Sequence, residues 1–421
     1  MNSASSLLLL LSLLALRAGG VGAEGGIEEK TSTASTSCAA SKKKILSFGG
    51  NGMIGSETLH RLIKTDEYDI TLVSRGSWPF DAGERIAPHV KSVICDRKAG
   101  IDTCNDLLDE IQSTDEYYAV LDFSAYNPNW IKDAVEALVG RVRLYVYVST
   151  DSVYEVTEME SYMKTGRRSA ENDAVRPVDG AMRERLNHRD SYGHRKLQGE
   201  EVLAEQRGSN QNEGVAYVSL RFADIIGPRD NTDRFLTYYA WIKFHDLESV
   251  PSIAVPHNVV EGTSITYVGD AASSIIAAID ESNVGGWDEA YNIGCEDIFN
   301  VTSQIMTIGH LLGKHSLRPK KDDIDLYIYP SVTKGPIDIA KARDRIGFVP
   351  TPLDVVLFKT VAWYENMYLE HRRFRDDVLS ELINILDEAY DYESDEERDD
   401  TIEALKAEVA RYDEALHIRF A

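Results

Sequence analysis

The feature that most constrains the fold is a glycine-rich turn that follows a short apolar segment. The apolar residues are Ile45–Phe48, and glycines then stand at positions 49, 52 and 55. This G-x-x-G-x-x-G spacing lets the chain turn sharply, lets backbone approach a pyrophosphate and lets a helix pack on the strand. Amides at the start of a helix, expected near Ser56, would then face the phosphates. The pattern predicts a dinucleotide-binding strand–turn–helix unit, and a purely structural glycine turn is the alternative.

After this unit, short apolar segments alternate with amphipathic ones. Strands are expected at 69–74, 90–95, 118–123, 143–149 and 215–222, and helices at 56–63, 103–111, 130–139 and 191–206. Further on, strands at 264–268 and 291–293 are expected among helices at 232–244, 271–279, 301–312 and 353–365. This alternation is typical of parallel sheets. The predicted fold class is α/β, a Rossmann-type doubly wound parallel sheet with a smaller C-terminal substrate-binding α/β lobe.

Composition divides the chain into four regions. We predict a signal peptide at 1–23, a flexible linker at 24–42, a main domain at 43–366 and an acidic helical extension at 367–421. Within the main domain the dinucleotide-binding core would cover about 43–222, and the substrate lobe mostly 223–350. Residues 155–190 are polar and carry six arginines without periodicity, which predicts a functional lid or a disordered insertion. Asp270 is expected to cap the helix at 271–279.

The N-terminus has the features of a targeting segment. Ser6–Leu16 is an uninterrupted run of small residues and leucine, shorter than the roughly 20 residues that span a bilayer. Val21-Gly22-Ala23 offers a small-x-small cleavage site. We therefore predict entry into the secretory pathway, as an ER-luminal or secreted protein with no membrane span in the mature chain. A bipartite plastid leader is the alternative.

The spacing of the cysteines and the net charge limit which metals and partners the chain is expected to bind. Cys38, Cys95, Cys104 and Cys295 form no C-x-x-C pair and no metal-ligand spacing, so no metal site is predicted. A Cys95–Cys104 bridge would suit an oxidising lumen, but Cys95 ends a predicted buried strand, so buried free thiols are expected. The formal charge of -24 argues against general nucleic-acid binding. Residues 371–421, with 16 Asp and Glu against 7 Lys and Arg, are expected to form one or two acidic surface helices.

A second group of residues, Thr150, Tyr192 and Lys196, indicates a catalytic site. The strand at 143–149 runs into Ser149-Thr150, and Tyr192 and Lys196 follow at helical i, i+4 spacing. An ammonium beside a phenol favours the phenolate and lowers the pKa of the tyrosine. A threonine hydroxyl can hydrogen-bond the same substrate oxygen, which gives a proton relay for oxidising a carbinol or reducing a carbonyl. A lone Y-x-x-x-K is common on helix surfaces, but after the glycine turn and five strands it is a strong signal.

These motifs resemble those of the extended short-chain dehydrogenase/reductases, the NAD(P)-dependent epimerase/dehydratase family, over about residues 44–366. The resemblance rests on the glycine turn, Ser149-Thr-Asp-Ser-Val-Tyr154, Tyr192-x-x-x-Lys196, Leu220-Arg-Phe before Gly227-Pro228, Ile265-Thr-Tyr-Val-Gly-Asp270, Tyr291-Asn-Ile-Gly294 and Asp338-Ile-Ala-Lys-Ala-Arg343. It implies a catalytic triad of Thr150, Tyr192 and Lys196, and an adenine contact at Asp96. The implied cofactor residues are Gly49, Gly52, Met53, Ile54, Gly55, Ser74, Arg75, Asp96, Tyr192 and Lys196.

Departures from the family pattern bear on cofactor and reaction. NAD-specific members place an acidic residue at the end of the second strand, where this chain has Ser74-Arg75. A guanidinium there can pair with a 2′-phosphate, so NADP is predicted over NAD; the alternative is that Arg75 stacks on adenine or faces solvent. Ser152 stands where dehydratases of the family have glutamate, and this disfavours dehydration.

The expected substrate contacts are Tyr126, Asp224 and Arg229. Asp224 stands where enzymes acting on nucleotide sugars often have asparagine against a phosphate, and it would repel that anion unless Arg229 screens it. A nucleotide sugar is one candidate substrate. Structural roles for both residues, in a turn and in a surface ion pair, are equally open.

The predicted function is an NAD(P)-dependent oxidoreductase or epimerase that acts on a hydroxyl or carbonyl group. The alternative is a catalytically silent dinucleotide-binding scaffold or sensor protein. A homodimer is expected through the helices at 191–206 and 130–139.

Overall fold

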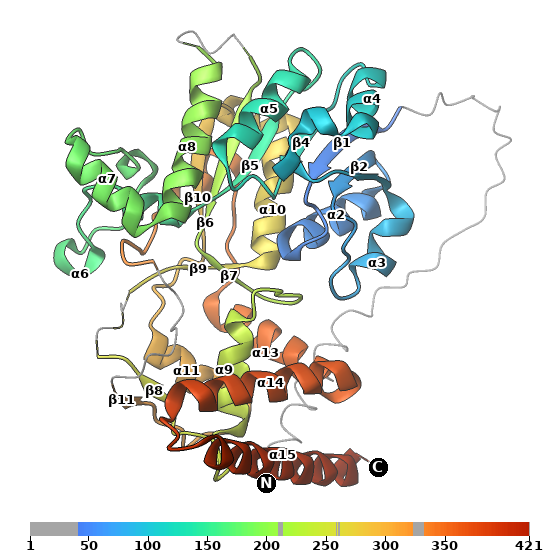
Figure 1. Cartoon of the computed structure of the whole chain (residues 1–421). Helices are drawn as coiled ribbons and strands as arrows, with labels where there is room; N and C mark the ends of the chain where they lie inside the picture. Colours follow the sequence, from blue (N-terminus) through green and yellow to red (C-terminus); the bar gives the residue numbers. More distant parts are fainter. Residues whose placement is uncertain (1–40, 209–213, 258, 260–261, 323–331, 421) are drawn as a thin grey trace, which may run out of the picture.

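The computed structural model describes residues 41–208, 214–257, 259, 262–322 and 332–420. The predicted signal peptide, most of the linker and Cys38 lie outside these residues. In Figure 1 a sheet with its covering helices occupies the upper part, and a mostly helical lobe lies below it.

The core of the upper part is a seven-stranded sheet in the order β10-β6-β5-β4-β1-β2-β3. Every neighbouring pair of strands in this sheet is parallel. The order reverses direction between β1 and β4, which is where doubly wound sheets bind ligands beyond the carboxyl ends of the strands. The strands are β1 (Lys43–Phe48), β2 (Tyr68–Ser74), β3 (Lys91–Ile94), β4 (Ala119–Asp122), β5 (Tyr145–Thr150), β6 (Tyr217–Phe222) and β10 (Glu289–Ile293).

The strands are apolar along their length because both faces of the sheet are covered. Side chains alternate between the faces: Ile45 and Val146 join one buried cluster, and Leu46 and Tyr147 join another. The first cluster lies under α2 (Met53–Thr65) and α10 (Val268–Ile279), and the second under α4 (Asn105–Ser113), α5 (Pro128–Leu138) and α8 (Ser191–Gln206). This confirms the predicted fold class.

The lower lobe has a separate, aromatic-rich core. Its helices are α9 (Arg234–Phe244), α11 (Val301–Leu311), α13 (Leu353–Glu370), α14 (Arg372–Ala389) and α15 (Asp395–Phe420). Two short parallel pairs complete it, β7 (Asp224–Ile226) with β9 (Ile265–Tyr267), and β8 (Ala254–Val255) with β11 (Lys320–Lys321). Short helices α3 (Ala82–Arg85) and α12 (Ala340–Ile346) lie elsewhere in the fold.

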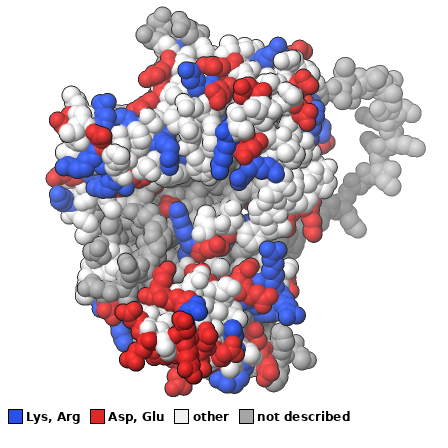
Figure 2. All heavy atoms as spheres, in the orientation of Figure 1, with Lys and Arg blue, Asp and Glu red and all other residues white. Residues whose placement is uncertain are grey.

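The acidic extension consists of α14 and α15, in agreement with one or two predicted helices. Its acidic side chains cover the lower surface in Figure 2. The opposite faces of both helices are apolar: Val378 and Leu382 of α14 and Leu405 of α15 are buried in the core that also contains Tyr239 and Tyr364. The extension is therefore packed into the lobe.

Residues 155–190 are ordered, so the expectation of a disordered insertion is wrong. They contain α6 (Tyr162–Thr165) and α7 (Gly180–Arg189). The Glu155 carboxylate accepts hydrogen bonds from the backbone amides of Thr333 and Lys334, at 2.7 Å each, and from Arg189 at 2.9 Å. Such bonds hold the segment together with a few apolar side chains, among them Val156 and Leu186, that are buried in the core.

The expectation for Asp270 is corrected. Helix α10 begins at Val268, so Asp270 lies inside its first turn and does not cap it. The Asp270 carboxylate instead accepts bonds of 2.7 Å from the amide and hydroxyl of Thr351. Asn300, in the only glycosylation sequon, caps α11 by accepting a 2.9 Å bond from the Ser303 amide. None of the described helices is both long and apolar enough to cross a membrane.

Cys95 and Cys104 form a disulfide, so the prediction of free thiols at these positions is wrong. Cys95 follows β3 and Cys104 immediately precedes α4, and two short 3-10 turns between them bring their Cα atoms to 5.6 Å, within bridging range. The strand ends at Ile94, one residue before the position at which a buried strand cysteine was expected. Cys295 is free and buried, as predicted.

Candidate active site

A cavity of about 1220 Å³ lies at the carboxyl ends of the strands and reaches the start of the lower lobe. In Figure 2 this face of the molecule is hollowed between its upper and lower parts. The cavity brings together all but one of the predicted site residues. They are Gly49, Gly52, Met53, Ile54, Gly55, Ser74, Arg75, Asp96, Tyr126, Thr150, Tyr192, Lys196 and Asp224.

The glycine turn has the geometry that its spacing predicts. Gly49 has φ +76°, and a Cβ there would lie 2.7 Å from the Ser124 Cβ. A Cβ at Gly55 would lie 2.5 Å from the Gly50 Cα, so only glycine allows helix and turn to approach this closely. At Gly52 a Cβ would meet nothing within 4 Å, and α2 starts at the next residue with no side-chain cap and no acidic residue in its first turn. These features fit a bound phosphate.

Thr150, Tyr192 and Lys196 converge on the cavity from β5 and α8. The Lys196 Nζ donates to the Ala125 carbonyl at 3.0 Å and the Val148 carbonyl at 2.9 Å. It also lies 5.8 Å from the centroid of the Tyr192 ring and 4.8 Å from that of Tyr126. An ammonium has three N–H donors, so two carbonyls leave one for a ligand.

The pKa of Tyr192 differs from the one expected from the sequence. Desolvation of the hydroxyl raises the pKa of Tyr192, although the residue as a whole is 40% exposed; the neighbouring Tyr126 adds to this rise, and a hydrogen bond with Thr150 acts in the opposite direction. Burial lowers the pKa of Lys196 to about 8, against the nearby Asp122 and Glu200 carboxylates. The predicted lowering of the tyrosine pKa is therefore not found, because desolvation raises it.

We call the end of the cavity at the glycine turn and the ends of β2 and β3 the cofactor end. Beneath it lies a buried ion pair that the sequence analysis missed. The Arg97 guanidinium donates to both Asp122 oxygens at 2.9 Å, and Asp122 Oδ1 also accepts from the amides of Ser124 and Ala125. The Tyr145 hydroxyl donates to Asp122 as well. The sequence signal for this ion pair was Asp122, a carboxylate near the end of the apolar run 118–123, because a buried charge needs a partner.

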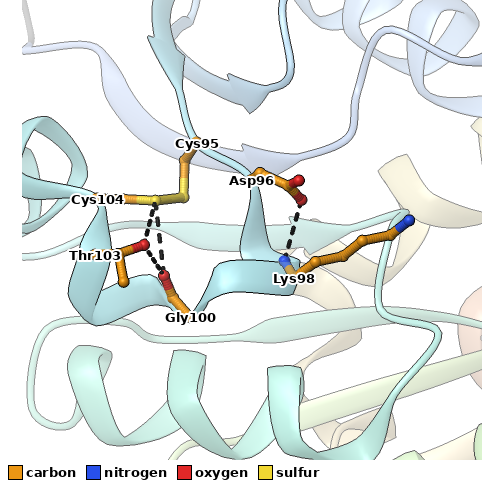
Figure 3. The surroundings of a disulfide bond; sticks show 6 residues. All are labelled: Cys95, Asp96, Lys98, Gly100, Thr103 and Cys104. Atoms are coloured by element: carbon orange, nitrogen blue, oxygen red, sulfur yellow. Dashed lines mark hydrogen bonds between the residues drawn. A yellow bond between two sulfur atoms is a disulfide. The ribbon is translucent and has the colours of Figure 1, made fainter.

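The segment from Cys95 to Cys104 forms the wall of the cavity at this end. Cys95, Asp96, Arg97 and Lys98 all line the cavity, and Asp96 accepts a 3.1 Å bond from the Lys98 amide. Figure 3 shows the disulfide at the base of this loop and the Lys98 side chain extending away from it. Arg75, at the end of β2, lines the same end.

At the opposite end of the cavity, formed by residues that follow β5, Arg229 does not have the expected role of a substrate contact. Its guanidinium pairs with Asp81, at 2.5 and 2.7 Å, and Arg229 does not line the cavity. Arg234, at the start of α9, pairs with Asp224 at 2.9 Å instead. The choice between two arginines five residues apart depends on where the turn after β7 directs each side chain, and the sequence does not show this.

Two more carboxylates line this end. Asp190 caps α8 by accepting a 2.7 Å bond from the Gly193 amide, and burial raises its pKa. Asp230 accepts bonds from the amide and hydroxyl of Thr232, at 2.9 and 2.6 Å. Burial raises the pKa of Asp230, although Thr232, Arg234 and the Phe235 amide favour its charged form.

The parallel sheet, the glycine turn and the Tyr192–Lys196 pair facing one cavity define the class of Rossmann-type nicotinamide-dinucleotide proteins. The profile of the NAD dependent epimerase/dehydratase family matches residues 45–294, more than half of the chain, so this chain belongs to that family. A comparison with curated protein sequences finds no match.

Solved structures share the fold at low sequence identity. The dTDP-glucose 4,6-dehydratase of Bacillus anthracis, in complex with NAD, aligns with a TM-score of 0.58 and 18% identity, covering 79% of this chain and 99% of that one. The UDP-glucose 4-epimerase of Thermotoga maritima, with UDP-glucose, gives 0.57 and 18%, covering 77% and 99%. The UDP-glucuronic acid 4-epimerase of Bacillus cereus, in complex with NAD, gives 0.55 and 20%, with the same coverage.

Proposed function

We propose that this protein is an NAD(P)-dependent oxidoreductase or epimerase that acts on a hydroxyl or carbonyl group. The observation that carries the proposal is that one cavity is lined by the open glycine turn and by Thr150, Tyr192 and Lys196. Bound nicotinamide would supply the site that gives or takes a hydride.

In this proposal, side chains of the protein transfer the proton and orient the substrate. Tyr192 exchanges a proton with the substrate oxygen, and Thr150 orients that oxygen by a hydrogen bond. Because its pKa is raised, Tyr192 is protonated in the free protein. Lys196 uses two N–H groups on carbonyls of the fold and presents the third to the ligand.

We propose NADP as the preferred cofactor. Arg75 is in position at the end of β2, and Ser74 Oγ accepts a 3.2 Å bond from the Gly76 amide, which orders the turn beside it. Two of the structural neighbours are in complex with NAD, so the preference rests on Ser74 and Arg75 of this chain alone.

The first test is binding of NADPH, NADP, NADH and NAD to the purified protein, measured by calorimetry and nicotinamide fluorescence. We expect Arg75→Ala to weaken NADP(H) binding by about 10- to 100-fold, the range of a charge-assisted hydrogen bond, and to leave NAD(H) unchanged. Equal affinity of the wild type for NAD and NADP would contradict the preference. Absence of binding by all four would support a scaffold in place of an enzyme.

The second test separates catalysis from binding. Tyr192→Phe should lower turnover by about 10²- to 10⁴-fold, the usual contribution of a positioned acid or base. Cofactor affinity should stay within about twofold, since the ring is retained. The assay covers carbonyl and hydroxyl compounds without a diphosphate, and beside them UDP-glucose and UDP-glucuronic acid, for which two of the structural neighbours are named. Turnover that is unaffected by the substitution would identify a different acid.

Assembly and location are further proposals. The disulfide supports a secretory compartment, because such bonds persist in oxidising environments. We propose a homodimer through α5 and α8, and sedimentation that shows only monomer at micromolar concentration would contradict it.

A further inference from the structure

The cavity carries opposite charge at its two ends. The cofactor end, formed by the glycine turn and the ends of β2 and β3, is lined by Arg75, Arg97 and Lys98 against Asp96. Apart from Lys196, the substrate end, formed by residues that follow β5 in the sequence, is lined by two cations and four carboxylates. They are Arg189 and Arg234, and Glu155, Asp190, Asp224 and Asp230.

Both guanidiniums at the substrate end already pair with carboxylates of the same end. Arg189 bonds Glu155 at 2.9 Å, and Arg234 bonds Asp224 at 2.9 Å. The undescribed internal segments 209–213, 258, 260–261 and 323–331 contain no lysine or arginine in the sequence. Within the described residues, Lys196 is therefore the one cation in the lining of this end that has no carboxylate ion-pair partner.

Asp230 differs from the other carboxylates of this end. Its side chain is only 4% exposed, and Oδ1 is satisfied by Thr232, but Oδ2 is buried and has no hydrogen-bond partner among the described residues. The turn that carries it is fixed by the ion pair between Arg229 and Asp81. A buried acceptor without a partner is costly, and a ligand that donates a hydrogen bond relieves that cost.

We infer that the substrate end binds a group with O–H or N–H donors, a hydroxyl or a protonated amine, against Asp230, and does not bind a diphosphate. A diphosphate would enter a space with four carboxylates, two arginines already paired with two of them, and Lys196 as the one other cation, so that repulsion by the carboxylates is expected to dominate. This inference rests on the proposed function, because it takes the cofactor to occupy the other end. It separates this chain from the structural neighbour that is solved with UDP-glucose.

The test compares three ligands that share a hexose and differ in charge: glucosamine, glucose and UDP-glucose. Each is titrated by calorimetry into the full-length protein saturated with NADP+. We expect glucosamine to bind at least about fivefold more tightly than glucose, because a charged donor bonds a carboxylate more strongly than a neutral one, and UDP-glucose to bind most weakly. Tightest binding by UDP-glucose, or binding by neither free hexose, would overturn the inference.

Two variants assign the effect to Asp230. In Asp230→Asn, which keeps the size and removes the charge, the preference for glucosamine over glucose should fall to within about twofold. Asp233→Asn removes the same charge three residues away, outside the cavity lining, and should keep the preference. A preference that survives Asp230→Asn would overturn the inference.

The design separates this inference from the proposed function. If NADP+ does not bind to the wild type, the proposed function fails first. If NADP+ binds and the ligand order is reversed, only the inference about the substrate end fails. Retained NADP+ affinity in Asp230→Asn shows that the variant is folded, and the comparison of ligands in the wild type needs no variant.

Discussion

The two ends of the cavity are stabilised in different ways. At the cofactor end, a disulfide closes the loop after β3, and the Arg97–Asp122 ion pair beneath it is 7% and 0% exposed. At the substrate end, the arginines of the two ion pairs are 53% and 42% exposed. Buried pairs cost much when one partner is lost, and exposed pairs contribute little. Because the carboxylates of the substrate-end pairs are themselves only 8% exposed, the contrast lies in the arginines, and losing Arg97 is expected to cost more stability than losing Arg189 or Arg234.

The strongest test of this difference is Arg97→Met. Removing the guanidinium leaves the Asp122 carboxylate buried without its ion-pair partner, and we expect the free energy of unfolding to fall by about 3–5 kcal/mol. Chemical denaturation followed by circular dichroism measures this. The control is Lys98→Met, the adjacent exposed residue, which should stay within about 0.5 kcal/mol of the wild type. Equal effects of the two variants would remove the basis of the comparison.

The disulfide should have the next largest effect. Cys104→Ser opens a loop with a sequence separation of 9, and the chain-entropy relation then gives a loss of about 2.5 kcal/mol in unfolding free energy. Reduction of the wild type with dithiothreitol should give the same loss and should add nothing to the variant. Unchanged stability in both experiments would show that the loop is held by its other contacts alone.

Between the two ends, Lys196 should make stability depend on pH. Because its pKa in the folded protein is about 8, against 10.5 as the ordinary value, the unfolded chain binds more protons than the folded protein in this interval. Stability contributed by this residue therefore rises with pH, by about 2 kcal/mol from about pH 8 to about pH 9.5. Unfolding of the cofactor-free wild type should show this rise relative to Lys196→Met. Parallel pH profiles would contradict the lowered pKa.

The smallest effect is expected at the substrate end. Arg234→Gln breaks the ion pair with Asp224, in which the arginine is 42% exposed, and should cost at most about 1 kcal/mol of stability. Thermal unfolding measured beside Arg97→Met gives the contrast directly. A loss as large as that of Arg97→Met would contradict this contrast between the arginines.

The sequence by itself determined the fold class, and all but one of the site residues predicted from it line the cavity. Alternation of apolar strands with helices, the G-x-x-G-x-x-G spacing and the i, i+4 relation of Tyr192 to Lys196 are local properties of the chain. Local properties set which elements form, and parallel strands then bring their carboxyl ends to one edge. Thr150, Arg75 and Asp96 reached one cavity for this reason, although each comes from a different strand end.

Only the tertiary structure decided which partner each charged or reactive group meets. It paired Cys95 with Cys104, directed Arg229 to Asp81 and Arg234 to Asp224, and raised the pKa of Tyr192 by desolvating its hydroxyl. It also left Asp230 Oδ2 without a partner among the described residues. These outcomes depend on turn geometry and on desolvation, which arise from contacts between segments distant in sequence. The spacing of residues along the chain carries no information about turn geometry or desolvation. It therefore predicted which residues line the site but not how their charges are paired.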